Sequence, residues 1–158
     1  MPALLYTITN IFCDLIMLNA AYTDGLGNRP LGLDTGYFIG IIQGDKNIIK
    51  HWEGLKTHEI IPYVSVLTLG EILYLTIRIG KPEQGRRMTE GIEKTSNIVD
   101  VNKQIVERAA ALKGGRGIPY VDSIIIASFL ENGCKEIHTK DRKHFEEAKG
   151  KGLKIVIW

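Results

Sequence analysis

Residues 119–141 read PYVDSIIIASFLENGCKEIHTKD, and the pattern of this segment indicates the fold class. Its first part predicts a buried helix over 119–130, because proline suits the first turn of a helix and the following Asn132-Gly133 suits its end. Its second part predicts a strand over 136–139, after which Asp141 caps a further helix. A strand enclosed by two helices in this way is the repeating unit of an α/β sheet.

The same alternation extends outward over the rest of residues 31–158. Apolar and β-branched runs predict further strands at 31–33, 60–66, 98–99 and 153–158. Helical spacing of apolar residues, together with proline and glycine signals, predicts helices at 37–42, 46–55, 68–79, 82–94, 101–112 and 142–149. Strands that alternate with helices form a mostly parallel sheet covered on both faces. We therefore expect a three-layer α/β domain with a central sheet of about five strands.

Length and composition fit one globular domain. The chain has 158 residues, of which 44% are hydrophobic and 24% charged, and this excludes global disorder and low complexity. Cys13 and Cys134 form no CxxC pair, which predicts reduced thiols in a cytoplasmic protein. The net charge of +2 is compatible with a polyanionic partner without requiring one.

Residues 1–30 differ from the rest, and we interpret them as an N-terminal extension of the domain at 31–158. Their apolar stretch is interrupted by Asn10, Asp14 and Asn19, and no Lys or Arg precedes Arg29. A membrane span tolerates a buried Asp poorly, and a signal peptide needs a basic start. We therefore expect no membrane association. N-terminal sequencing of the native protein would show whether it begins near Leu31.

Four carboxylates stand where the carboxyl ends of parallel strands form a crevice. Asp34 and Asp141 each follow a predicted strand, whereas Glu71 and Asp122 lie in the first turns of predicted helices. Each has a local explanation: Asp34 and Asp141 as helix caps, Glu71 in a capping box with Thr68, and Asp122 through the helix dipole. These local explanations predict no spatial relation among the four residues. A shared crevice predicts that their carboxylates lie close together.

Four carboxylates in one crevice would repel one another and raise the pKa of at least one. A divalent cation relieves that repulsion, and hard oxygen ligands with surplus negative charge suit Mg²⁺ or Mn²⁺. The chemistry that such a centre favours is metal-assisted hydrolysis of a phosphodiester bond.

Four motifs, in order along residues 31–158, resemble those of PIN-domain nucleases. They are LDTGYFI at 33–39, SVLTLGE at 65–71, PYVDSIIIA at 119–127 and HTKDRKHF at 138–145. The resemblance implies a metal-dependent endoribonuclease in which Asp34, Glu71, Asp122 and Asp141 hold Mg²⁺ or Mn²⁺, with the Thr139 hydroxyl in support. The motifs are most similar to those of VapC-like toxins. That subgroup implies an RNA substrate, an antitoxin protein as a partner, and a possible homodimer.

The chain departs from the family pattern at His144. Many members carry a second acid before the phenylalanine of the last motif, and here His144 precedes Phe145. A contact between His144 and phosphate is one interpretation, but we expect a solvated helix histidine. The four histidines lack zinc-ligand spacing with either cysteine, and no phosphate-binding GxxxxGK[ST] loop occurs.

Basic residues near the predicted crevice are candidates to bind the RNA backbone: Lys81, Arg86, Arg87, Lys140, Arg142 and Lys143. An apolar helical face contains Ile72, Tyr74, Leu75 and Ile79, and we interpret it as core, with a dimer contact as the alternative. Two other functions stay open at this point. One is a PIN-type nuclease of RNA maturation, and the other is a non-catalytic binding module on the same fold.

Overall fold

The structure, a computed structural model, describes residues 30–150 and 152–158. The predictions for residues 1–29 therefore lie outside the described residues. Five strands form one sheet with the order β3-β2-β1-β4-β5, and every neighbouring pair is parallel. Their bounds are β1 Leu31–Leu33, β2 Tyr63–Ser65, β3 Asn97–Val99, β4 Glu136–Thr139 and β5 Lys154–Ile157. The predicted five-stranded parallel sheet is confirmed.

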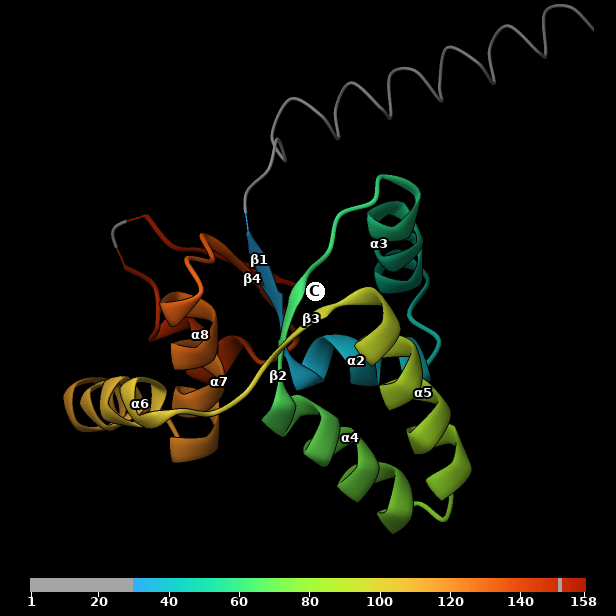
Figure 1. Cartoon of the computed structure of the whole chain (residues 1–158), viewed down its shortest axis with the longest axis horizontal. Helices are drawn as coiled ribbons and strands as arrows, with labels where there is room; N and C mark the ends of the chain where they lie inside the picture. The colour runs from blue at the N-terminus through green and yellow to red at the C-terminus, as the bar shows by residue number, and fades with distance from the viewer. Residues whose placement is uncertain (1–29, 151) are drawn as a thin grey trace, which may run out of the picture.

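Helices cover both faces of the sheet, as the three-layer prediction requires. Figure 1 shows α2, α3, α4 and α5 on one side of the strands and α6, α7 and α8 on the other. The helices are α2 Thr35–Ile42, α3 Lys46–Thr57, α4 Val66–Arg78, α5 Pro82–Thr95, α6 Lys103–Arg116, α7 Tyr120–Glu131 and α8 Arg142–Glu146. Among the helices of the described residues, none is long and apolar enough to cross a membrane.

The core consists of two apolar layers, one on each face of the sheet. Alternate residues of β1 belong to different layers, because successive side chains of a strand point to opposite faces. Leu31 and Leu33 are buried in the layer that includes Tyr37 and Phe38 of α2. On the opposite face, a Cβ atom at Gly32 would lie 2.5 Å from the Phe129 ring, so only glycine lets α7 pack this closely on the central strand.

The ends of several elements differ from prediction, among them those of β2, α4 and α8. Strand β2 covers Tyr63–Ser65 rather than 60–66, and α4 begins at Val66 rather than at residue 68. The cause is Ser65, which is the N-cap of α4. Its backbone is extended, and its side-chain hydroxyl accepts a hydrogen bond from the Leu67 amide. Helix α8 ends at Glu146 rather than at residue 149. Beyond it, the Ala148 amide donates a hydrogen bond to the Phe145 carbonyl, three residues earlier, and the chain does not continue as α-helix.

Candidate metal centre

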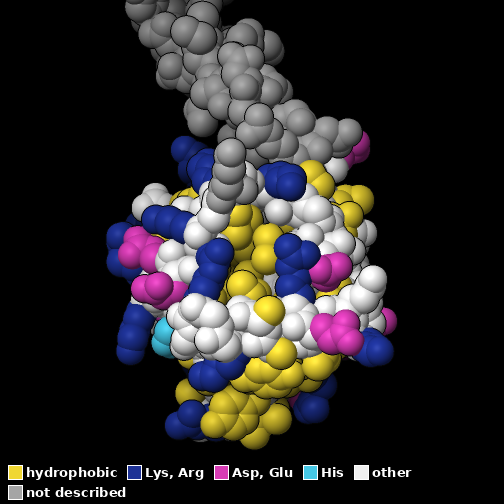
Figure 2. Space-filling model, turned by 90° about the vertical axis from the view of Figure 1, so that its left-hand side faces the viewer, with side chains coloured by type: hydrophobic (Ala, Val, Ile, Leu, Met, Phe, Trp, Pro, Cys, Tyr) yellow, Lys and Arg dark blue, Asp and Glu magenta, His cyan; other side chains and the backbone are white. Residues whose placement is uncertain are grey.

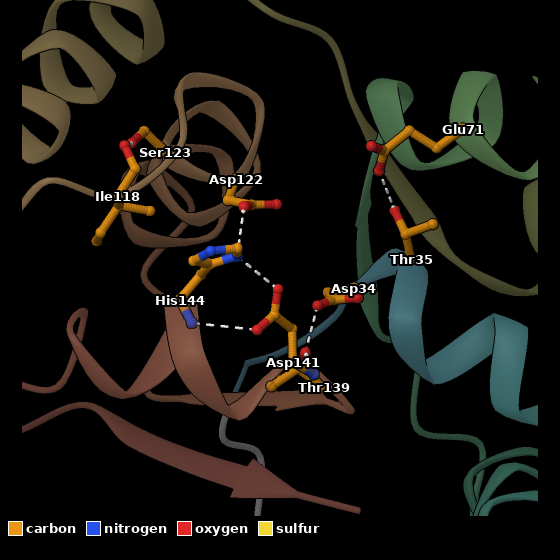
Figure 3. Close-up of polar contacts among 9 residues, drawn as sticks. All are labelled: Asp34, Thr35, Glu71, Ile118, Asp122, Ser123, Thr139, Asp141 and His144. Carbon is orange, nitrogen blue, oxygen red and sulfur yellow. Dashed lines mark hydrogen bonds and ion pairs between the residues drawn. The ribbon is translucent and has the colours of Figure 1, made fainter.

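A pocket of about 350 Å³ lies at the carboxyl ends of the central strands. All four predicted carboxylates line it, although they are separated by up to 107 residues in sequence, from Asp34 to Asp141. Figure 3 shows these side chains approaching one another from the two halves of the domain. Parallel strands bring their carboxyl ends to one edge of the sheet, which is why segments far apart in sequence meet here.

Asp34 follows β1 directly, and it is almost completely buried, with 3% of its surface exposed. Its carboxylate caps α2 by accepting the Gly36 amide and also accepts a hydrogen bond from the Thr139 hydroxyl. Burial raises the pKa of Asp34 to about 7. The two hydrogen bonds lower this pKa, and the charges of Asp122 and Glu71 raise it. A buried carboxylate with such a pKa is one that a bound cation would stabilise.

Glu71 lies more than one turn inside α4, and its carboxylate points across the pocket toward α2. Thr35 Oγ1 donates a hydrogen bond of 2.5 Å to Glu71 Oε2 (Figure 3). The capping-box interpretation of Glu71 is therefore wrong, because Ser65 is the cap of α4. The side chain of Glu71 is directed to the pocket rather than back to its own helix start.

Asp122, Asp141 and His144 form a connected group on the other side of the pocket. The predicted cap is confirmed, since Asp141 Oδ1 accepts the His144 amide of α8 at 3.1 Å. The His144 ring lies with Nδ1 2.7 Å from Asp141 Oδ2 and 3.2 Å from Asp122 Oδ2. The expectation of a solvated His144 is wrong, because the first turn of α8 directs its ring at both carboxylates.

The electrostatics of Asp122 also reflect this shared environment. Burial raises the pKa of Asp122, and the charges of Asp141 and Glu71 raise it further, whereas His144 lowers it. Two of the four carboxyls, Asp34 and Asp122, thus have raised pKa values, as expected for acids that share one crevice.

The sequence of residues 32–151 matches the profile of the PIN domain. The chain belongs to the PIN-domain family. The matched segment contains all four carboxylates of the pocket. No curated protein sequence matches the chain.

Solved structures of other proteins share this fold. DNA-bound VapBC from Salmonella typhimurium matches with a TM-score of 0.66 and 20% identity, over 82% of this chain and 98% of that one. VapBC2 from Rickettsia felis, bound to a promoter DNA fragment, matches with a TM-score of 0.66 and 17% identity, over 81% and 98%. VapBC-1 from nontypeable Haemophilus influenzae matches with a TM-score of 0.60 and 22% identity, over 81% and 97%. At these identities the likeness shows the fold.

The hydroxyl of Thr139 connects two of the carboxylate segments of this PIN domain. Thr139 is fully buried at the end of β4. Its Oγ1 donates to Asp34 and accepts the backbone amide of Asp141 at 2.9 Å. Thr139 therefore lies where the prediction puts it, and its support of a metal ion stays a prediction.

Of the predicted RNA-binding residues, Lys140 lines the pocket of the PIN domain. Its Nζ lies 3.3 Å from Asp45 Oδ2, so part of its charge is already paired. Arg142 and Lys143 are exposed on α8 beside the pocket, and Arg142 pairs with Glu146 at 3.1 Å. The remaining candidates, Lys81, Arg86 and Arg87, are exposed at the start of α5 and do not line the pocket. Their contacts with RNA stay predictions.

The donor set of the pocket fits a divalent cation. Ligand atoms of Asp122, Asp141 and His144 lie within 4.8 Å of one another, and Asp34 and Glu71 line the same pocket. Four carboxylates supply hard oxygen donors and a surplus of negative charge. Sequence reasoning missed the parts of Thr35 and His144. A sequence signal exists for His144. It lies three residues after Asp141, and this spacing places both side chains on one side of a helix start.

Proposed function

We propose that this PIN domain is an endoribonuclease that depends on Mg²⁺ or Mn²⁺ and acts as the toxin of a toxin–antitoxin pair. The observation that carries the proposal is the convergence of Asp34, Glu71, Asp122 and Asp141 on one pocket. The family supports hydrolysis of phosphodiester bonds, because PIN domains are in general nucleases.

The carboxylates of the pocket would hold the cation, and burial raises the pKa of two of them, Asp34 and Asp122. When bound, such an ion activates a water molecule and stabilises negative charge on the phosphoryl group. The chain's own residues prepare the site. Thr139 and the Gly36 amide orient Asp34, Thr35 orients Glu71, and the Lys140 ammonium at the pocket wall would contact a phosphate oxygen.

An apolar rim beside the pocket supports a protein partner. Tyr74 and Ile77 of α4 are 57% and 61% exposed, and Tyr120 and Val121 of α7 are each 44% exposed. Tyr74 and Val121 are neighbours in sequence of the pocket residues Leu75 and Asp122, and Ile77 and Tyr120 lie two positions from them. Figure 2 shows hydrophobic side chains gathered at the lower end of the molecule, toward which the carboxyl ends of the strands point in Figure 1. A partner that covers this rim would also close the pocket.

The antitoxin is the partner that we propose for this rim. The similar solved structures include VapBC and a toxin–antitoxin complex from Klebsiella pneumoniae, and such a partner explains why large apolar side chains are left exposed around a charged pocket. A small neighbouring gene that encodes a DNA-binding segment and a tail would separate this proposal from a nuclease of RNA maturation.

The reaction is tested with purified full-length protein and a long single-stranded RNA in Mg²⁺, Mn²⁺ or EDTA. We expect metal-dependent cutting that falls by about a hundredfold or more in Asp34→Asn and Asp122→Asn, since even residues that only support ligands cost about 10–100-fold. Asp100→Asn is the matched control, because Asp100 is exposed and does not line the pocket.

Two results would contradict the proposal. One is cutting that persists in EDTA or in the Asp34→Asn variant at the wild-type rate. The other is a wild-type protein that neither cuts RNA nor gains thermal stability from Mg²⁺ or Mn²⁺, which would favour a non-catalytic binding module.

A further inference from the structure

The imidazole of His144 lies between two carboxylates that come from different helices. Its Nδ1 is 2.7 Å from Asp141 Oδ2 and 3.2 Å from Asp122 Oδ2. Figure 3 shows the ring between the two acids, directed into the centre. One oxygen of each acid and a ring nitrogen lie within 4.8 Å of one another, which is the spacing of ligand atoms around a single ion.

The position of this ring is determined before any ion binds. Asp141 Oδ1 accepts the backbone amide of His144, so the carboxylate is held with Oδ2 toward the ring. The next residue, Phe145, is 1% exposed and anchors α8 in the apolar layer below. The nitrogen donor is therefore preorganised beside two oxygen donors, which lowers the entropy cost of assembling a centre from all three residues.

We propose that His144 is itself a metal ligand, through Nδ1, in a mixed carboxylate–imidazole centre that prefers a first-row transition-metal ion such as Mn²⁺ over Mg²⁺. The inference rests on the proposed function, because it requires a divalent ion in this pocket. Mg²⁺ is bound almost entirely through oxygen, whereas imidazole nitrogen suits transition-metal ions. An acid at this position would keep the centre all-oxygen, and His144 replaces one oxygen donor by nitrogen.

Ligation through Nδ1 requires its lone pair, so the ring that would hold the ion is the neutral imidazole with its proton on Nε2. A proton on Nδ1, where it would bridge to Asp141, would be released to solvent when the ion takes its place.

The nitrogen signal of such a centre can be assigned to one residue. The chain has four histidines, and His144 is the one whose ring nitrogen lies among ligand atoms of the pocket residues Asp122 and Asp141. His51 and His138 stack on each other with ring centroids 4.5 Å apart, and the Trp158 indole donates to His138 Nδ1. An imidazole nitrogen bound to an ion in this pocket is therefore that of His144.

The test is pulsed electron paramagnetic resonance of Mn²⁺ bound to the full chain, with natural-abundance and ¹⁵N-histidine-labelled protein. We expect the modulation of a directly bound imidazole nitrogen in the wild type. It should be retained in the matched control His58→Gln and lost in His144→Gln. Loss of Mn²⁺ binding in Asp34→Asn locates the ion in this pocket.

Competition between Mn²⁺ and Mg²⁺ measures the preference, with free Mn²⁺ quantified from its resonance signal. We expect His144→Asp to reduce the preference for Mn²⁺ by about tenfold or more, in the range by which residues around a metal alter its affinity. Mn²⁺ bound without a nitrogen signal, or an unchanged preference in His144→Asp, overturns this inference and leaves the proposed nuclease intact. A wild-type chain that binds no Mn²⁺ overturns both. The wild-type spectrum decides ligation even if a variant fails to fold.

Discussion

At the scale of single residues, several side chains of the pocket serve the fold and the site together. Asp34 caps α2 with one carboxylate oxygen and accepts from Thr139 with the other. Asp141 caps α8 and binds His144 in the same way. A capping role and a place in a carboxylate cluster are therefore not alternatives, because a carboxylate has two oxygens and several lone pairs.

Asp34 also gives a prediction about stability and pH. Its pKa rises from 3.8 to about 7 on folding, so the protonated form is favoured in the folded state. Its contribution to stability is fully present below pH 3.8 and is lost as the pH rises through about 7. Asn resembles the protonated acid, so Asp34→Asn should stabilise the metal-free protein at pH 8 by up to about 4 kcal/mol.

The measurement is thermal unfolding of both proteins in EDTA between pH 4 and pH 8. The advantage of Asp34→Asn should shrink as the pH falls toward 4, where the wild-type carboxyl is protonated in the folded state and partly protonated in the unfolded state. Melting temperatures that differ by the same amount at every pH would show that burial of the charge is not the cause.

At the scale of elements, the packing of α7 on the sheet depends on one small residue. Gly32, in the middle of β1, contacts the Phe129 ring so closely that an added Cβ would lie 2.5 Å from it. Gly32→Ala should therefore destabilise the domain by about 1–3 kcal/mol, the usual cost of overpacking a core. Gly91 in α5 has no atom within 4 Å of an added Cβ. Gly91→Ala should be neutral or stabilising by up to about 1 kcal/mol, because alanine suits a helix better.

Urea unfolding of the two alanine variants beside the wild type checks this pair. A Gly32→Ala variant as stable as the wild type would mean that Phe129 moves away without cost. The pair separates crowding at the sheet from the general effect of replacing glycine, since both variants add the same methyl group.

At the scale of the whole molecule, the exposed apolar residues predict association with another chain. The interpretation of the α4 face as core is correct for Ile72, which is fully buried, and wrong for Tyr74 and Ile79, which are 57% and 60% exposed. Ile77 adds a further exposed side chain on the same helix. Surface of this kind is typical of a protein interface, and the antitoxin is the partner proposed for it, whereas the homodimer stays a prediction.

Ile77→Glu should weaken binding of the neighbouring gene product without changing Mn²⁺ affinity, because Ile77 lies on the exposed rim and does not line the pocket. Light scattering coupled to gel filtration measures the assembly, and Ile61→Glu is a control for an equally exposed isoleucine on the segment before β2. Equal assembly in the two variants would show that α4 is not the interface.

The α/β class, the parallel sheet and the four candidate carboxylates could be predicted from the amino-acid sequence, because periodicity, caps and turn residues are local signals. It did not determine where β2 ends and α4 begins, since Ser65 and Thr68 are both acceptable caps and only packing selects between them. Nor did it determine what Glu71 and His144 contact. Those contacts join residues of different elements, or depend on the direction in which a helix start aims a side chain. They depend on the folded chain, which brings the carboxyl ends of the strands together at one edge of the sheet.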